Sequence, residues 1–588
     1  MSLDVKKYQS YKKWLLYHLV NQKLLLFGVI AGISIVTLSR VLVPIIIGYI
    51  IDTTLITHDL AKLLVLLIVV LAIYLVRNGM DYITMLIGHF LGLRTEQYMR
   101  QEFFDTIQHK SLRYHDIAKT GDLEALATND LRIINTMLSH GAFYIYPFFQ
   151  VFLAFLFFFL TLDARLALIC IPFFAIYFYF VLDYRKKITP WAAARMVRHS
   201  DLVVVLQESI SGTPIVKAFT AEKWERKKFA KAVIGYRDNR IGETRVQARF
   251  YPLLVLNITI GTIFLISVIW VFQNTLSVGV LTAANLLLIT LLEPTNMIFW
   301  ATNDMMSGFA ACSRLFNSLL IEENETKDGK FEEWPKSFAG KIEFRNVTFA
   351  YGEGKKPVLQ NVSFTIEKNQ RVALVGPTGC GKTTLVKLLL RLYEPQEGII
   401  FLDGRNIQDF PLNELRRHIG YIEQDIYLFS RSIKENIAFG KPNASDEEIQ
   451  TVAELAQVHD FVKEFPDQYN TIVGERGTRL SGGEKQRVAI ARAFLTDPNI
   501  MILDDAVSAV DSDTEEKITR ALENIAQNRT TLIITHRLHT IRSSDKILVL
   551  KQGQIIAEGD HNKLLQYSSD YRRIFGKYQL LPPLRIKN

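Results

Sequence analysis

One stretch of the chain has the residue types and spacing of a phosphate-binding loop. Its pattern is G-x-x-x-x-G-K-T-T, and it comprises Gly376, Pro377, Thr378, Gly379, Cys380, Gly381, Lys382, Thr383 and Thr384. An apolar run precedes it and a helical pattern follows it, which is the context that this motif requires. Glycines let backbone N–H groups surround phosphates, and the helix N-terminus adds positive potential. We predict that Lys382 reaches the terminal phosphates and that Thr383 binds Mg²⁺.

Two carboxylates follow a second apolar strand, far downstream of the loop. Asp504 and Asp505 come directly after the apolar residues 500–503. A carboxylate at the end of a strand beside a phosphate loop holds Mg²⁺, usually through water. We therefore predict that Asp504 is the metal-binding carboxylate, and that Asp505 is the residue placed to polarise an attacking water.

A second helix start also has the composition of an anion site. It comprises Leu480, Ser481, Gly482, Gly483 and Glu484. A serine and two glycines at a helix N-terminus present backbone N–H groups to an anion. One bound nucleotide does not need two phosphate cradles. Two chains packed head to tail would use both cradles, since the second cradle of one chain could close the phosphate-loop site of the other.

The elements that must position these residues fall into two halves, because 588 residues exceed what one hydrophobic core can organise. Each of six apolar segments in the first half can cross a hydrocarbon core of ~30 Å. These segments are residues 24–51, 63–93, 143–160, 166–182, 253–272 and 280–300. Lys and Arg are concentrated in the connections after the second and fourth segments. The positive-inside rule therefore places these connections, both termini and the second half in the cytoplasm.

The predicted fold is an α-helical membrane domain of six spanning helices followed by an α/β phosphate-loop domain. We assign residues 1–320 to the membrane domain, with helical extensions into the cytoplasm, 321–340 to a linker and 341–588 to the α/β domain. The net charge is +9. The basic residues flank the apolar runs, where they suit anionic lipid headgroups better than nucleic acid. The three cysteines have no metal-site spacing and imply no disulfide framework.

Four ionisable residues lie inside the apolar segments. A charge in a membrane is energetically costly, so each of these residues is a candidate for a functional role. They are Arg40, Arg77, Asp81 and Glu293. Pro294 is expected to kink the helix beside Glu293. This glutamate either faces a central cavity and attracts a cationic substrate, or it forms a structural pair with Arg40 or Arg77. We favour the pair.

Taken together and in this order, the motifs resemble those of an ATP-binding cassette, and the whole chain resembles an ABC exporter half-transporter. The resemblance implies that ATP and Mg²⁺ are the cofactors, with residues 376–384 as Walker A, Asp504 as Walker B and residues 480–486 as the signature. It further implies that Tyr351 stacks on adenine, that Gln424 senses Mg²⁺ and the membrane domain, and that His536 contacts the γ-phosphate. Residues 120–123 and 216–219 resemble the regions that couple the two domains of exporters.

Asp505 departs from the family pattern, in which the catalytic base is glutamate. Aspartate is one methylene shorter, so its carboxylate falls back by about 1.5 Å. A misplacement of ~1 Å can cost about 10²-fold in rate. Either the site is impaired, or backbone adjustment lets Asp505 work; we favour impairment.

With aspartate at position 505, the chain resembles one partner of the heterodimeric bacterial multidrug exporters. The resemblance implies a second half-transporter subunit as partner, contact with membrane lipids, and a multi-pass location in the plasma membrane. The expected activity is ATP-driven export of small amphipathic compounds or lipids. The alternatives are an ATP-gated channel or receptor-type subunit, and a homodimeric lipid flippase.

Overall fold

The computed structural model describes residues 8–575, apart from a set of short gaps. These gaps are residues 56–58, 142–149, 151, 155, 157–162, 322–334, 336–337, 353, 505–515, 517, 519–520, 523–525 and 527. The chain forms two compact units. The first comprises Met1–His109 and Ala118–Glu322, and the second comprises Lys110–Ile117 and Glu323–Asn588. Most of the predicted linker and of the third predicted span lies outside the described residues.

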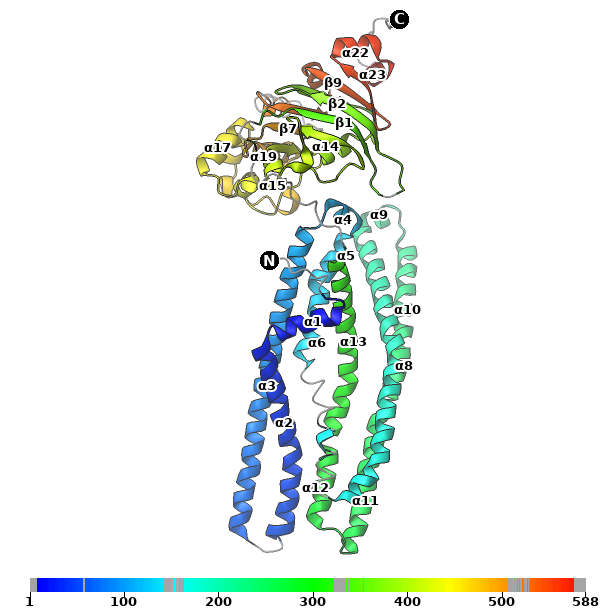
Figure 1. The fold of residues 1–588 in the computed structure, drawn as a ribbon. Coiled ribbons are helices and arrows are strands. Elements are labelled where there is room, and N and C mark those ends of the chain that lie inside the picture. The colour runs from blue at the N-terminus through cyan, green and yellow to red at the C-terminus, as the bar shows by residue number, and fades with distance from the viewer. Residues whose placement is uncertain are drawn as a thin grey trace. The chain divides into compact units, whose positions relative to one another are not determined.

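The first unit is helical throughout the part that the structure describes (Figure 1). Its α-helices are α1 (Tyr11–Val20), α2 (Lys23–Ile50), α3 (Leu60–Gln108), α5 (Thr120–Ala125), α6 (Leu131–Ser139), α8 (Ala164–Ser211), α9 (Thr213–Ala218), α10 (Glu222–Ala248), α11 (Tyr251–Phe272), α12 (Val278–Ile289) and α13 (Leu292–Leu320). Among the described residues, five helical stretches are long and apolar enough to cross a membrane. They coincide with five of the six predicted spans.

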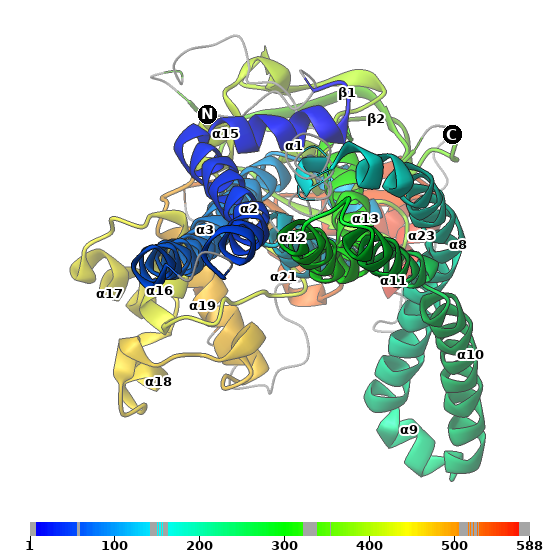
Figure 2. The same cartoon turned by 90° about the horizontal axis from the view of Figure 1, so that it is seen from below.

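Helices α3 and α8 extend well beyond a membrane core. They contain 49 and 48 residues, which at 1.5 Å per residue gives each a length of about 70 Å, more than twice the hydrocarbon thickness. The predicted helical extensions of the spans are therefore present. Helix α9 joins α8 to α10 at the tip of that pair (Figure 2), and it includes most of the segment 216–219 that resembles a coupling region.

The helices of the membrane hairpins begin at capping residues. Asp59 of α3, Asp163 of α8 and Ser277 of α12 each accept a hydrogen bond from a backbone N–H of their own first turn. Such caps satisfy N–H groups that have no partner within the helix. Asp52 adds a second link at this end, since it accepts hydrogen bonds from Ser277 and from the backbone of Gly279. Local sequence thus fixes where these helices start.

The second unit contains two sheets flanked by helices (Figure 1). Its strands are β1 (Ile342–Phe349), β2 (Leu359–Ile366), β3 (Arg371–Val375), β4 (Glu397–Leu402), β5 (Arg405–Asn406), β6 (Ile419–Ile422), β7 (Ile500–Asp504), β8 (Thr530–Ile534), β9 (Lys546–Lys551) and β10 (Gln554–Gly559). The smaller sheet is antiparallel, in the order β2-β1-β4-β5. The larger has the order β10-β9-β3-β8-β7-β6, and all of its neighbouring pairs except β10–β9 are parallel.

Helices cover both faces of the larger sheet, and alternate side chains of β7 pack into the hydrophobic core on each face. The helices of this unit are α4 (Leu112–Ile117), α14 (Lys382–Leu389), α15 (Leu412–Arg417), α16 (Ile433–Ile437), α17 (Asp446–Leu455), α18 (His459–Lys463), α19 (Gly482–Phe494), α21 (Leu538–Arg542), α22 (His561–Tyr567) and α23 (Ser569–Phe575). Ile500 and Ile502 pack into the core that contains α14. Met501 and Leu503 pack into the core that contains α16 to α19. Successive side chains of a strand point to opposite faces, so a strand buried on both sides is apolar throughout.

Helix α4 was predicted to belong to the first unit, as part of residues 1–320, but it groups with the second. Leu112 packs against the core of the phosphate-loop sheet, and Tyr114 is buried. The segment after α3 that groups with the second unit is therefore α4, which precedes the residues 120–123 that resemble a coupling region. Those residues begin α5 of the first unit.

Candidate nucleotide-binding site

The phosphate loop joins β3 to α14, as the motif predicted, and its glycines are sterically required. Gly379 and Gly381 have φ angles of +77° and +109°, a region that side chains other than glycine rarely adopt. A Cβ atom at Gly376 would lie 2.1 Å from the carbonyl oxygen of Leu550. The loop therefore turns tightly and presents the N-terminus of α14, which begins at Lys382.

The side chain of Lys382 folds back over its own loop. Its Nζ donates hydrogen bonds to the carbonyl oxygens of Gly376 at 2.8 Å and of Pro377 at 3.1 Å. Both acceptors are neutral and belong to the loop itself. A phosphate oxygen is a stronger acceptor for an ammonium than a carbonyl is, because the hydrogen bond is then charge-assisted at both ends. This lysine can exchange its partners when an anion enters the loop.

Thr383 and Asp504 meet beside the loop and provide oxygen ligands. The Thr383 hydroxyl donates to Oδ2 of Asp504 at 3.0 Å. Asp504 is only 3% exposed at the end of β7. A hydroxyl and a buried carboxylate are the donors that Mg²⁺ prefers, so this pair fits the ion. Asp505 follows directly but lies outside the described residues.

Tyr351 also reaches the phosphate-loop helix. It is half-buried after β1, and its hydroxyl lies 3.0 Å from Oγ1 of Thr384. Two residues that the motif analysis missed lie around its ring. The Tyr393 ring meets it edge-on with centroids 5.2 Å apart, and Nζ of Lys387 lies 5.6 Å from its centroid. Lys387 is three residues after Thr384, a helical spacing that could have indicated proximity.

Gln424 and His536 occupy corresponding places on two other strands. Gln424 lies two residues after β6, and His536 lies two residues after β8. Both side chains are exposed. Strands β3, β6, β7 and β8 are parallel, so their carboxyl ends share one edge of the sheet. The topology therefore brings the phosphate loop, Asp504, Gln424 and His536 to one edge, where ligands of α/β sheets bind.

The signature residues form a capped helix start in the other core of the unit. Ser481 precedes α19, its hydroxyl accepts from the backbone of Glu484, and Glu484 accepts from the backbone of Ser481 at 2.7 Å. This reciprocal capping box fixes the first turn. Leu480 is buried, whereas Ser481 and Gly482 are exposed. Among the described residues, no atom beyond the glycine's own neighbours and helix backbone lies within 4 Å of the position that a Gly482 Cβ would take, so the helix start is accessible.

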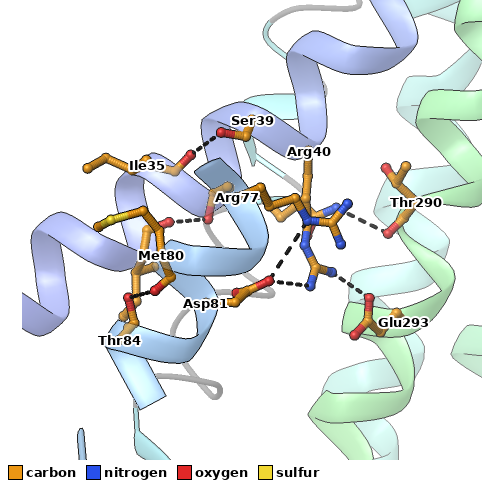
Figure 3. A network of polar contacts seen from close by, with 12 residues as sticks. Ile35, Ser39, Arg40, Arg77, Met80, Asp81, Thr84, Thr290 and Glu293 are labelled. Atoms are coloured by element: carbon orange, nitrogen blue, oxygen red, sulfur yellow. Dashed lines mark hydrogen bonds and ion pairs between the residues drawn. The ribbon is translucent and has the colours of Figure 1, made fainter. Parts of the chain in front are cut away.

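The ionisable residues predicted inside the spans form one network (Figure 3). Arg40 of α2 lies between Asp81 of α3 and Glu293 of α13, with nitrogen–oxygen distances of 3.8 and 2.5 Å. Nε of Arg77 lies 3.9 Å from Asp81. The side chain of Arg40 is 9% exposed and that of Glu293 is 55% exposed. The two cations and two anions neutralise one another, as intramembrane charges require, and Glu293 makes the structural pair that the sequence analysis favoured.

The fold and these sites together define a membrane transporter driven by an ATP-binding cassette. The family model for the ABC transporter transmembrane region matches residues 25–295, and that for ABC transporter matches residues 359–508. An uncharacterized ABC transporter ATP-binding protein of Bacillus subtilis, YwjA, is 34% identical over 93% of this chain and 95% of its own length. The ATP-dependent lipid A-core flippase of Syntrophus aciditrophicus is 34% identical over 86% of this chain and 84% of its own length.

A solved structure, that of a bacterial Atm1-family ABC exporter with ATP bound, matches with a TM-score of 0.82 and 28% identity. It covers 94% of this chain and 98% of that one. The chain belongs to the ABC transporter family, as an exporter half-transporter that fuses one transmembrane domain to one ATP-binding cassette. It is a multi-pass membrane protein whose ATPase activity is coupled to export, and half-transporters of this kind act as dimers.

Proposed function

We propose that this chain is one subunit of a heterodimeric exporter in the plasma membrane, with an impaired ATP site of its own. The proposed cargo is small amphipathic compounds or lipids. The observation that carries the proposal is the contrast between Asp504 and Asp505. The Thr383 hydroxyl donates to the Asp504 carboxylate, an oxygen pair that suits Mg²⁺, whereas the family's glutamate is replaced by a shorter aspartate. ATP binding is retained, and the step that needs a well-placed base is slow.

Residues of this chain supply binding more than turnover at their own site. Lys382 turns from its loop carbonyls to the terminal phosphates, while Tyr351 stacks on the base and His536 contacts the γ-phosphate. Thr383, Asp504 and Gln424 would hold Mg²⁺, whose positive charge would offset that of the phosphates. Asp505 orients the attacking water poorly because its carboxylate falls short. The bound ATP therefore persists and favours closure through its higher affinity for the closed state.

The partner's site receives this chain's signature. Ser481 and Gly482 are exposed at the start of α19, and this helix N-terminus can bind phosphate on the partner. A second observation supports a partner, since α9 and its flanks expose apolar side chains. These are Ile210, Ile215, Phe219 and Trp224. Four large apolar side chains left exposed within one short stretch are typical of an interaction site. The hydrolysis that resets transport then takes place mainly on the partner's Walker motifs.

A second candidate is a homodimeric lipid flippase. It is favoured by one observation, the name of the Syntrophus relative, which is a lipid A-core flippase. In that case Asp505 would work as a base in both sites after a backbone adjustment. Glu293 already pairs with Arg40, so this carboxylate is not needed to attract a cationic cargo. Lipids and neutral compounds are then equally suitable as cargo.

The experiment that separates these candidates starts from the protein that co-purifies with this chain. We expect a different half-transporter, and we expect ATP-driven uptake into inverted vesicles only when both subunits are present. Replacing the partner's catalytic glutamate should abolish uptake. Full ATPase activity and uptake by this chain alone would overturn the heterodimer. Downhill ion flux on ATP addition, without uphill uptake, would instead indicate a channel subunit.

A further inference from the structure

Exposed basic side chains gather where two neighbouring helices leave the predicted membrane region. Helix α8 packs against α10 and α11 (Figure 1). The fourth predicted span ends at residue 182 in α8, and the fifth begins at residue 253 in α11. Arg185 and Lys186 follow the first of these limits, and Arg245 and Arg249 precede the second. All four residues are exposed, and we call them the basic cluster.

An aromatic contact brings the two halves of the basic cluster together. The ring of Tyr184 in α8 meets that of Phe250, between α10 and α11, with centroids 5.0 Å apart. Tyr184 is buried. It directly precedes Arg185, and Phe250 directly follows Arg249. The backbone segments that carry these two arginines therefore lie close together.

The carboxylates of this region already have cationic partners. Asp183 accepts a hydrogen bond from Lys187 at 2.6 Å. The buried Glu243 pairs with Arg195 at 3.0 Å and with Arg240 at 2.9 Å. These two acids are the only ones in residues 183–190 and 240–252 of the sequence. Within the part of the chain that the structure describes, neither of them forms an ion pair with the basic cluster, whose charge they leave available to a ligand.

The distance of the basic cluster from the spans matches that of a phospholipid headgroup. At 1.5 Å per residue, Arg185 lies about 5 Å beyond the fourth span and Arg249 about 6 Å before the fifth. The headgroup region extends roughly 5–8 Å beyond the hydrocarbon core. Arg245 lies one turn further along α10, and a long side chain of this type can extend its charged end back toward the headgroups.

The surface beside the basic cluster is apolar and aromatic, as a lipid-facing surface is. Leu182 of α8 and both Leu254 and Ile258 of α11 are exposed. Tyr179 and Tyr251 are exposed near the two span limits, and tyrosine is enriched at membrane–water interfaces. A free anion would contact only the cations. A phospholipid would contact the cations with its phosphate and the apolar side chains with its acyl chains.

The opposite end of the same helices carries no comparable excess of charge. Arg165 at the start of α8 pairs with Asp163 at 2.8 Å, and residues 273–277 after α11 contain no charged side chain. The unneutralised cations of this helix pair therefore lie at one membrane surface. The positive-inside rule makes it the cytoplasmic surface, whose leaflet contains anionic lipids.

We propose that α8 and the junction of α10 with α11 bind the headgroup of an anionic phospholipid. The basic cluster donates charge-assisted hydrogen bonds to the phosphate, and the exposed apolar side chains of the two spans contact the acyl chains. Bound lipid offsets the mutual repulsion of the four cations and so stabilises the packing of α8 on α11. The site uses none of the ATP-binding residues, and it does not depend on the heterodimer or on the cargo.

The test is equilibrium binding of phosphatidylglycerol, labelled on an acyl chain, to the full-length transporter in neutral detergent micelles. Unlabelled phosphatidylglycerol should displace the probe at about tenfold lower concentration than phosphatidylcholine does. A cation at the headgroup contributes about fivefold to lipid affinity. Arg185→Gln/Lys186→Gln and Arg245→Gln/Arg249→Gln should therefore each weaken probe binding by about tenfold or more. Raising the salt concentration should weaken binding to the wild type more than to either variant.

A matched control separates a local site from net charge. Lys227→Gln/Lys231→Gln removes two exposed lysines of the same α10. They lie about 27 Å or more further from the span than Arg249 does, which exceeds the Debye length in physiological salt, so this variant should bind the probe as the wild type does.

Three results would overturn the proposed lipid site. The first is wild-type affinity for the probe in both variants of the basic cluster. The second is an equal loss of affinity in the Lys227→Gln/Lys231→Gln control, which would show that only net charge acts. The third is displacement of the probe by inorganic phosphate as effectively as by phosphatidylglycerol, which would indicate a site for free anions. None of these results bears on vesicle uptake, which tests the proposed function.

Discussion

Arg40 in the membrane unit and Lys382 in the cassette are both cations held at a site, but their partners differ in kind. Arg40 contacts two carboxylates, Asp81 and Glu293, on two other helices. Lys382 contacts two neutral carbonyl oxygens within its own loop. Arg40 is neutralised by carboxylates, whereas the contacts of Lys382 within the described residues are with neutral oxygens.

The difference shows what each site is built to do. Moving Arg40 away would leave carboxylates uncompensated in a region of low dielectric, which is strongly unfavourable. Moving Lys382 costs only hydrogen bonds to carbonyls, and an entering phosphate replaces them with stronger ones. A neutralised cluster therefore stabilises one arrangement of helices, whereas a lysine held only by carbonyl oxygens of the described residues can attract an anionic ligand. Four predictions test this comparison.

The largest effect should follow loss of the Lys382 cation. We expect Lys382→Ala to weaken binding of ATP to this chain by at least about 10²-fold, as for removal of one preorganised cationic donor from a charged ligand. Photolabelling of this subunit with azido-ATP measures the change. The matched control is Lys563→Ala, which removes a lysine from the exposed surface of α22 and should leave labelling unchanged. Labelling of Lys382→Ala at the wild-type level would contradict the role given to this lysine.

Removing the neutralised cation should destabilise the fold and spare ATP binding. Arg40→Met leaves Asp81 and Glu293 without their shared partner, and we expect a loss of about 3 kcal/mol in the free energy of unfolding. Thermal unfolding in lipid micelles measures it. The double variant Arg40→Met/Glu293→Gln should recover most of the loss, because Arg77 remains beside Asp81. An unchanged melting temperature for Arg40→Met would show that the network does not stabilise the helices.

A smaller effect should come from completing the catalytic site. Asp505→Glu restores the missing methylene, and we expect ATP turnover by the intact transporter to rise about tenfold. Steady-state phosphate release measures it. Asp505→Asn serves as the comparison, since an amide cannot act as a base and should give no increase. A lower rate for Asp505→Glu would mean that Asp505 already works as the base in its present position.

The smallest effect should follow neutralisation of the more exposed member of the network. Glu293→Gln should cost about 1 kcal/mol or less, because more than half of the Glu293 side chain is exposed and Arg40 keeps Asp81. Uptake of cationic and of neutral compounds should fall equally or not at all. A selective loss of cation uptake would instead assign Glu293 to the substrate.

Much of this molecule follows from local sequence. The phosphate loop needs a strand, three glycines and a helix start within a few residues, so Gly376, Gly379, Gly381 and Lys382 are recognisable without a structure. Five of the predicted spans coincide with long apolar helices, because a membrane demands an uninterrupted apolar run. The capping box at Ser481 and Glu484 is equally local.

Tertiary structure decided the contacts between distant positions. The sequence showed that Arg40 and Glu293 needed partners, but only the tertiary fold brought the two side chains together across 253 residues. Nothing in the local periodicity predicted that the Tyr393 hydroxyl donates to Asp116 of α4, 277 positions away, or that α4 would group with the cassette. Periodicity specifies which face of an element is buried, whereas the partner of that face depends on how the whole chain is threaded.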